Sequence, residues 1–164
     1  MRLFFRVALL TFLVDQITKV LVVHLMDLQT RGVIDVVSPF LNFRMAWNRG
    51  INFGLFAGDA EVMRWGLIVL ALGISGWVTW WVRSDGAPFW QAIFGGLLVG
   101  GALGNVLDRL VYGAVADFLN MSCCGLENPY VFNVADIAIF AGALGLVLVP
   151  AKSGGKTGRK KKTP

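Results

Sequence analysis

The sequence predicts an all-α membrane protein with four transmembrane helices. Its 164 residues are 56% hydrophobic and only 15% charged, a composition too apolar for an ordinary soluble domain of this size. Each of four windows is close to the ~20 apolar residues that cross a ~30 Å hydrocarbon core. These windows are residues 3–26, 62–82, 89–107 and 130–149, and no soluble domain is left over.

Basic residues predict how this bundle is oriented. Arg2, Arg6 and Arg83 flank the same end of the windows, and so does the C-terminal tail. Because Lys and Arg are enriched on the cytoplasmic side of membrane proteins, both termini are expected to be cytoplasmic. We expect one integral membrane domain over residues 1–150 and a basic, disordered tail at the membrane surface over 151–164.

The first window carries Asp15 and Lys19, four residues apart and therefore on one face of a helix. If this helix starts near residue 3, the two side chains lie about 18 and 24 Å from its cytoplasmic end, in its outer half. Taken alone, the pair favours structural charge neutralisation over direct chemistry.

Residues 27–60 are predicted to form a long connection outside the membrane. Within it, residues 41–48 alternate apolar and polar side chains, the period-two pattern of a half-buried strand. Asn48 and Gly50 follow closely; glycine lets the backbone approach a ligand, and Asn supplies a donor and an acceptor. A plain turn explains this spacing equally well.

The second and third windows differ in character. Residues 62–82 predict a scaffold helix that closes with several Trp at the cytoplasmic interface. Residues 89–107 contain Gly96, Gly100 and Gly104 at four-residue spacing, a pattern that brings helices into close contact. Asn105 and Arg109 follow on one face, about 24 Å or more from the cytoplasmic end.

The fourth window contains Asp136 within the apolar run FNVADIAIF. An ionised side chain in hydrocarbon costs at least ~2.5 kcal/mol, so such residues usually face a bundle interior and mark function. If the helix begins near residue 130, Asp136 lies only about 9 Å below its outer end. Three helices thus place polar groups at one depth, which favours a functional site over scattered polarity.

A partner for Asp136 is expected in the segment YGAVADFLNM, which carries Asp117. Its alternation indicates an extended or interfacial piece. Alone, Asp117 would be interpreted as a solvated loop acid; with Asp136 it completes a pair of carboxyls at the outer membrane boundary. Two close carboxyls share a proton, so that one acts as base and the other as acid. This pair suits peptide hydrolysis by activated water.

Other chemistries lack their residues in this sequence. A Ser or Cys nucleophile has no convincing base, because the chain has one histidine, and a zinc site lacks ligands. We therefore expect no metal, cofactor or nucleic-acid partner. A proton-coupled transporter remains an alternative, although no matching half-sequences appear and the inner half of the bundle lacks polar groups. An assembly scaffold would explain the glycines but not Asp136.

Five motifs together resemble bacterial lipoprotein signal peptidase, also called signal peptidase II, an aspartic protease family of the cytoplasmic (inner) membrane. They are DQITK, NRGINF, GGALGNVLDR, VADF and FNVAD, which begin at residues 15, 48, 100, 115 and 132. The resemblance spans nearly the whole chain. It implies four transmembrane helices with a small outward-facing β-sheet cradle and an interfacial helix, and an active site near the outer leaflet.

The resemblance also implies the function of the carboxyl pair. Asp117 and Asp136 would be the catalytic dyad. The enzyme would act on diacylglyceryl-modified prolipoproteins, cleave them N-terminal to the lipidated cysteine, and be blocked by globomycin-type inhibitors. Separately from the resemblance, we expect the protein to be a monomer. Asn133 is expected to orient Asp136 or bind the substrate backbone, and Arg109 to stabilise the strand or loop that carries Asp117. The residues implied to shape or support the site are Asp15, Lys19, Asn48, Gly50, Asn105, Arg109, Asn133 and Ala135.

Overall fold

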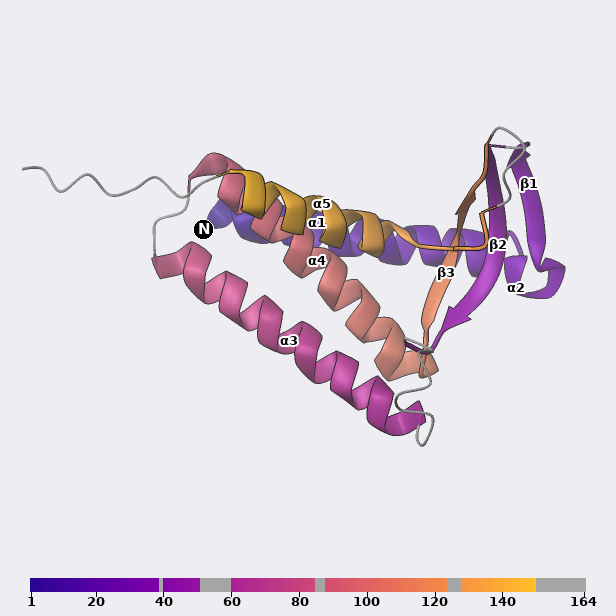
Figure 1. The fold of residues 1–164 in the computed structure, drawn as a ribbon, viewed down its shortest axis with the longest axis horizontal. Helices are drawn as coiled ribbons and strands as arrows, with labels where there is room; N and C mark the ends of the chain where they lie inside the picture. Colours follow the sequence, from indigo (N-terminus) through magenta and orange to yellow (C-terminus); the bar gives the residue numbers. More distant parts are fainter. Residues whose placement is uncertain (39, 51–59, 85–87, 124–127, 150–164) are drawn as a thin grey trace, which may run out of the picture.

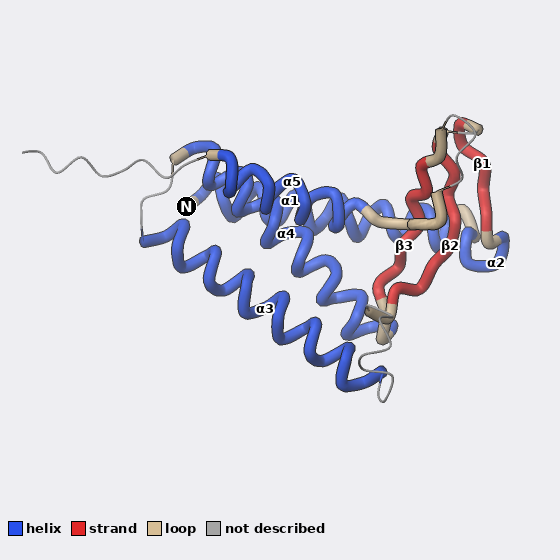
Figure 2. Tube along the Cα trace, in the orientation of Figure 1, coloured by secondary structure: helices blue, strands red, loops and turns tan. Residues whose placement is uncertain are grey.

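The computed structural model describes residues 1–38, 40–50, 60–84, 88–123 and 128–149, so the predicted tail at 151–164 lies outside the described residues. Long helices form one part of the molecule, and a three-stranded sheet stands at the end opposite the N-terminus (Figures 1 and 2). The helices are α1 (Arg2–Lys19), α2 (Leu28–Arg31), α3 (Ala60–Ser84), α4 (Phe89–Tyr112) and α5 (Val134–Leu148), and α1 continues as a π-helix, η1 (Val20–Leu25). The strands are β1 (Val33–Val37), β2 (Leu41–Asn48) and β3 (Val115–Met121).

Among the described residues, three helical segments are long and apolar enough to cross a membrane: Arg2–Leu25, Glu61–Ser84 and Phe89–Tyr112. Helix α5 is apolar but has 15 residues, which is about 22 Å of helix. It starts later than the predicted window at 130 because Phe132 pairs with Leu119 of β3 and Asn133 then caps the helix. Asp136 therefore lies in the first helical turn instead of a full turn deeper.

Helix α4 is the centre of the bundle, and its glycines allow close packing on α1. A Cβ on Gly96 would lie 2.8 Å from the carbonyl oxygen of Phe4, and one on Gly100 would collide with the carbonyl oxygen of Ala8. Helix α5 packs on α4 in the same way, because a Cβ on Gly142 would lie 2.6 Å from the amide nitrogen of Leu98. The predicted contact through the glycine stripe is confirmed.

The sheet is antiparallel with the order β1-β2-β3. Strand β2 coincides with the predicted strand at 41–48, and the predicted extended piece around Asp117 is β3. Alternate β2 side chains, including Phe43 and Trp47, pack on a core that contains Val23 of η1 and Phe118 of β3. This apolar contact holds the sheet against the end of the helices that lies opposite the N-terminus. Beside the sheet, the described residues also form the short helix α2, which is a single turn long.

The pairing of β2 with β3 is interrupted by a bulge between Phe43 and Ala46. Beyond it, Ala46 pairs with Asp117 and Asn48 pairs with Val115. Side chains two residues apart on a strand share a face, so this register places Asn48 on the same face as Asp117. Bulges commonly re-aim side chains beside functional sites.

Candidate active site

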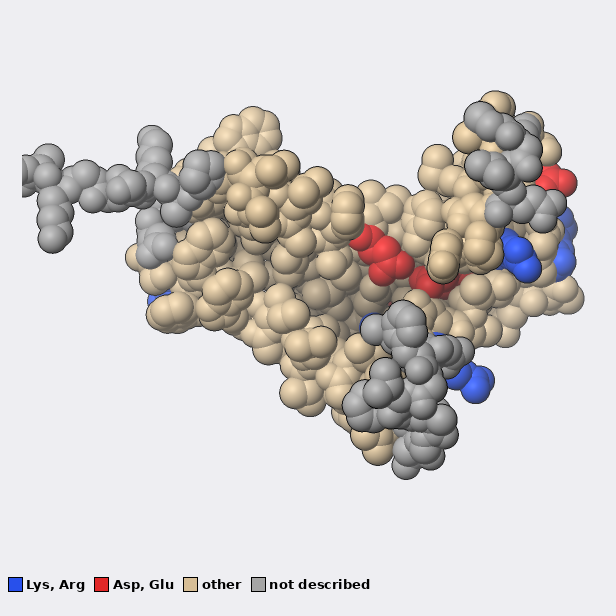
Figure 3. Space-filling view, in the orientation of Figure 1, with Lys and Arg blue, Asp and Glu red and all other residues tan. Residues whose placement is uncertain are grey.

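Asn133 brings the two predicted carboxyls together. Its side-chain nitrogen Nδ2 donates to Oδ1 of Asp117 over 2.6 Å, and its backbone nitrogen donates to Oδ2 of Asp136 over 3.3 Å. Its side-chain oxygen accepts from the backbone nitrogen of Asp136 over 2.9 Å, which completes a capping box at the start of α5. Asp117 is 2% exposed and Asp136 is half-buried. Figure 3 shows acidic side chains at the surface where the helices meet the sheet.

Asn105 of α4 extends this hydrogen-bond network. Its Nδ2 donates to Oδ1 of Asp136 over 2.9 Å, while its Oδ1 accepts from Nδ2 of Asn133 over 3.2 Å and from Nζ of Lys19 over 3.2 Å. Two donors therefore face its oxygen and one acceptor faces its nitrogen, which fixes the orientation of the amide. Asp136 is thus held by donors from two different elements.

Asn48 holds Asp117 from the side of the sheet. Its Nδ2 donates to Oδ2 of Asp117 over 3.0 Å, and its Oδ1 accepts from the backbone nitrogen of Gly50 over 3.0 Å. Gly50 has a φ of 119°, in the region that favours glycine. A Cβ there would also lie 2.8 Å from Cγ of Met63. The turn at Gly50 therefore sets which end of the Asn48 amide faces the carboxyl.

Asp117 has the electrostatics of an acid that is protonated near neutrality. Burial raises the pKa of its carboxyl from 3.8 to about 7, and the charge of Asp136 acts in the same direction. The hydrogen bonds from Asn48 and Asn133 and the charge of Lys19 oppose this increase in pKa. Two neighbouring carboxyls of which one keeps its proton can act as general acid and general base.

A second, fully buried charge cluster lies beneath the carboxyl pair. Nζ of Lys19, a residue 5% exposed, lies 2.8 Å from Oδ2 of Asp15 and 2.7 Å from Oδ2 of Asp108. The predicted ion pair within α1 is therefore part of a cluster that also includes α4. Oδ1 of Asp15 accepts from the backbone nitrogen of Ala135 over 2.9 Å, which ties α1 to the N-terminus of α5.

Asp108 links this cluster to the strand that carries Asp117. Its Oδ2 accepts from the backbone nitrogen of Ala116 over 3.2 Å. Nη1 of Arg109 donates to the backbone oxygen of Asn105 over 3.3 Å, and its charge lies within electrostatic reach of Asp136 and Asp117. A role of Arg109 in stabilising β3 thus stays a prediction.

Comparison with known proteins identifies the family. The family model described as Signal peptidase (SPase) II matches residues 7–151. The chain belongs to the signal peptidase II family. It is 41% identical over 141 residues to the lipoprotein signal peptidase of Methylobacterium sp. strain 4-46, covering 84% of this chain and 82% of the relative. It is 40% identical over 150 residues to that of Methylobacterium radiotolerans, covering 92% and 86%.

A solved structure of a bacterial membrane enzyme obtained by the in meso method is also similar. It superposes with a TM-score of 0.71 at 26% identity and covers 87% of this chain and 83% of the solved one. The suspected resemblance to signal peptidase II is therefore confirmed, together with a largely helical fold that carries a small antiparallel sheet.

Three polar residues in or beside this hydrogen-bond network were not given a role from the sequence. Asp108 was noted in its motif but given no role, and Gln16, whose Nε2 donates to Asp15 over 3.1 Å and to Asp108 over 3.1 Å, was overlooked. Arg64 of α3 donates to the backbone oxygens of Arg109 and Leu110 and so caps the end of α4. The sequence did offer a signal for them, because Gln16 and Asp108 lie within two of the motifs and Arg64 lies in an otherwise apolar helix. Polar side chains in apolar helices need hydrogen-bond partners, so each of the three could have been expected to have one.

Proposed function

We propose that this chain is an aspartic endopeptidase that removes the signal peptide from diacylglyceryl-modified prolipoproteins, cleaving N-terminal to the lipidated cysteine. The curated relatives named lipoprotein signal peptidase support the substrate class. The observation that carries the catalytic assignment is the contact of one residue, Asn133, with both Asp117 and Asp136. Among the other supporting residues named from the sequence, Asn48 and Asn105 contact the pair, and Ala135 contacts Asp15 of the cluster beneath it. Gly50 and Arg109 act one step away, through hydrogen bonds to Asn48 and Asn105 respectively.

In the proposed mechanism Asp136 is the base and Asp117 the acid. Asp136 is half-exposed and accepts hydrogen bonds from Asn105 and Asn133 at a helix N-terminus, an environment that suits a carboxylate. It takes a proton from a water molecule whose oxygen bonds to the scissile carbonyl carbon. Protonated Asp117 donates a hydrogen bond to the carbonyl oxygen as negative charge develops there. The tetrahedral intermediate then breaks its C–N bond, and the departing amine takes up a proton from the pair.

The position of the pair fits a lipid-anchored substrate. Asp117 and Asp136 lie at the end of the bundle that carries the sheet. Asp117 is in β3, which follows the end of α4, and Asp136 is in the first turn of α5. We place this end at the outer leaflet of the bacterial cytoplasmic membrane, with both termini in the cytoplasm, because of the basic residues at the opposite end. The protein acts as a monomer in this proposal, and globomycin-type cyclic peptides bind at the pair.

Processing of a lipidated precursor in detergent tests the proposal. Asp117→Asn and Asp136→Asn should each abolish cleavage, because each removes one role of the acid–base pair. Asp35→Asn, on the edge strand β1, is the matched control and should cleave at the wild-type rate. Cleavage by either dyad variant at more than a small fraction of the wild-type rate would contradict the assignment.

A further inference from the structure

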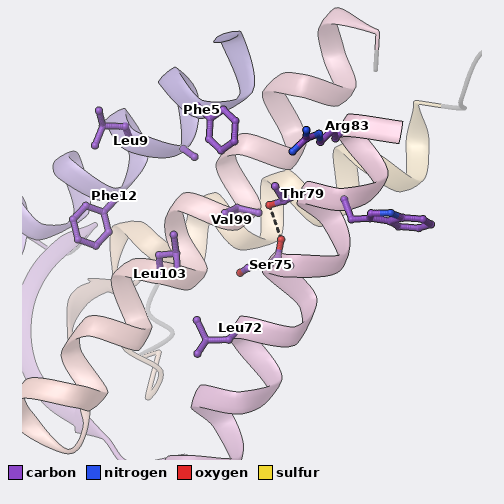
Figure 4. A pocket seen from close by; sticks show the side chains of 12 residues that line it. Phe5, Leu9, Phe12, Leu72, Ser75, Thr79, Arg83, Val99 and Leu103 are labelled. Atoms are coloured by element: carbon purple, nitrogen blue, oxygen red, sulfur yellow. Dashed lines mark hydrogen bonds between the residues drawn. The ribbon is translucent and has the colours of Figure 1, made fainter. Parts of the chain in front are cut away.

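A groove lies between α1, α3 and α4 in the half of the bundle away from the carboxyl pair. Its volume is about 740 Å³, within the range of small-molecule sites. Apolar side chains line most of it, among them Phe5 and Phe12 of α1, Leu72 of α3 and Val99 of α4 (Figure 4). Because these helices are apolar enough to span a membrane, the groove opens to lipid rather than to water.

Polar groups follow one face of α3 along this groove. Ser75, Thr79 and Arg83 are spaced four residues apart, and all three line it (Figure 4). Oγ1 of Thr79 donates to the backbone oxygen of Ser75 over 2.7 Å. Oγ of Ser75, a residue 5% exposed, has no hydrogen-bond partner among the described residues. A buried hydroxyl without a partner is unfavourable, so a ligand that accepts its hydrogen bond would be stabilised.

Arg83 gives the end of the groove a positive charge. The lining contains no acidic side chain, and among the described residues no carboxylate pairs with Arg83. Trp77, Trp80 and Trp81 surround this end of α3, and Trp side chains gather at the level of the lipid headgroups. We therefore expect the guanidinium to lie at the level of the lipid phosphates, at one end of the groove.

We propose that this groove binds one anionic phospholipid of the bilayer. An acyl chain lies between α1 and α3 against Val99 of α4, an ester oxygen accepts from Ser75, and the phosphate pairs with Arg83. Basic pockets between transmembrane helices recognise lipid headgroups through this combination of charge and apolar contact. The bound lipid fills the space that separates α3 from α1 and so fixes the angle of α3.

The lipid of the proposed substrate does not fit this groove as well. A diacylglyceryl thioether carries no phosphate, so it gives Arg83 no partner. The groove is also lined by α3 from Leu72 to Arg83, whereas the carboxyl pair lies near the other end of that helix, where Arg64 contacts α4. The site is therefore distinct from the proposed active site and does not depend on the proposed function.

Native mass spectrometry of the full chain in detergent tests this proposal. Phosphatidylglycerol and diacylglycerol with the same acyl chains serve as probes, and the wild type should retain phosphatidylglycerol about fivefold better, the effect expected for one phosphate–Arg contact. Arg83→Gln should abolish this difference while diacylglycerol retention persists. Arg31→Gln, on the exposed turn α2, should leave the difference unchanged.

A second, independent test is to fill the groove with a larger side chain. Gly76 lines the groove, and a Cβ there meets no atom within 4 Å, so the side chain of Gly76→Leu can leave the helix at this point and should occupy the groove and weaken retention of both lipids. Gly73→Leu is the matched control on the same helix, because Gly73 is equally open and lies outside the groove. Three outcomes would overturn the proposal: equal retention of the two lipids by the wild type, an equal effect of both Leu substitutions, or displacement of the lipid by glycerol 3-phosphate.

Discussion

Asn133 donates its side-chain amide to Asp117 over 2.6 Å while its side-chain oxygen caps the helix that carries Asp136. One side chain thus has two functions, since the same amide fixes the start of α5 and the position of a carboxyl on β3. The two functions can be separated by choosing substitutions that keep or lose the cap.

Asn133→Ser should therefore separate stability from activity. Ser is a good N-cap but has no nitrogen to donate to Asp117 or Asn105, so the variant should keep the contribution of the cap, unfold at a higher temperature than Asn133→Ala, and lose at least ~10-fold in kcat. Asn133→Ala should lose the activity and, in addition, ~0.5–2 kcal/mol of stability through the cap. Thermal unfolding and cleavage assays in detergent measure both. Equal stability of the Ser and Ala variants would show that the cap contributes little.

The rate of cleavage should fall as the pH rises through about 7. Below that value Asp117 holds its proton and can act as the acid, and above it the proton is lost, since burial and Asp136 set the pKa of Asp117 at about 7. Asn48→Ala removes a donor that favours the carboxylate, so the alkaline limb should move to higher pH. Measurements of kcat/KM from pH 5 to 9 check this; a rate that is flat across this range would exclude Asp117 as the acid.

Lys19→Met should strongly destabilise the protein. It leaves the carboxyls of Asp15 and Asp108 buried without their cation, and breaking a buried ion pair in this way costs ~3–5 kcal/mol. Lys19→Met combined with Asp108→Asn removes one of the two uncompensated charges and should recover part of the loss. The midpoint of thermal unfolding in detergent is the measurement. A double variant no more stable than the single one would mean that Asp108 is not coupled to Lys19.

Gly104→Ala should reduce activity through the same cluster. A Cβ at this position would lie 2.5 Å from Oδ2 of Asp15, so the carboxyl must move away from Lys19 and from the backbone of Ala135. Gly73→Ala is the matched control in an open part of α3, where alanine is favoured over glycine by up to ~1 kcal/mol. We expect lower stability and slower cleavage for Gly104→Ala, and unchanged cleavage for Gly73→Ala. A fully active Gly104→Ala variant would show that the site tolerates displacement of Asp15.

The sequence by itself determined where the apolar helices and the strand at 41–48 lie, and it identified Asp117 and Asp136 as candidate site residues. It could do so because hydropathy, periodicity and side-chain type are local properties of the chain. It also placed Asp15 and Lys19 on one face, which the structure confirms as an ion pair.

The tertiary structure alone decided the partners of these groups. The bulge in β2 sets Asn48 beside Asp117 across 69 positions of sequence, and Asp108 joins Lys19 to β3. The later start of α5, which moves Asp136 into a helical first turn, depends on the pairing of Phe132 with β3. Such contacts depend on helix packing and strand register between distant segments, and no pattern within a single segment specifies them.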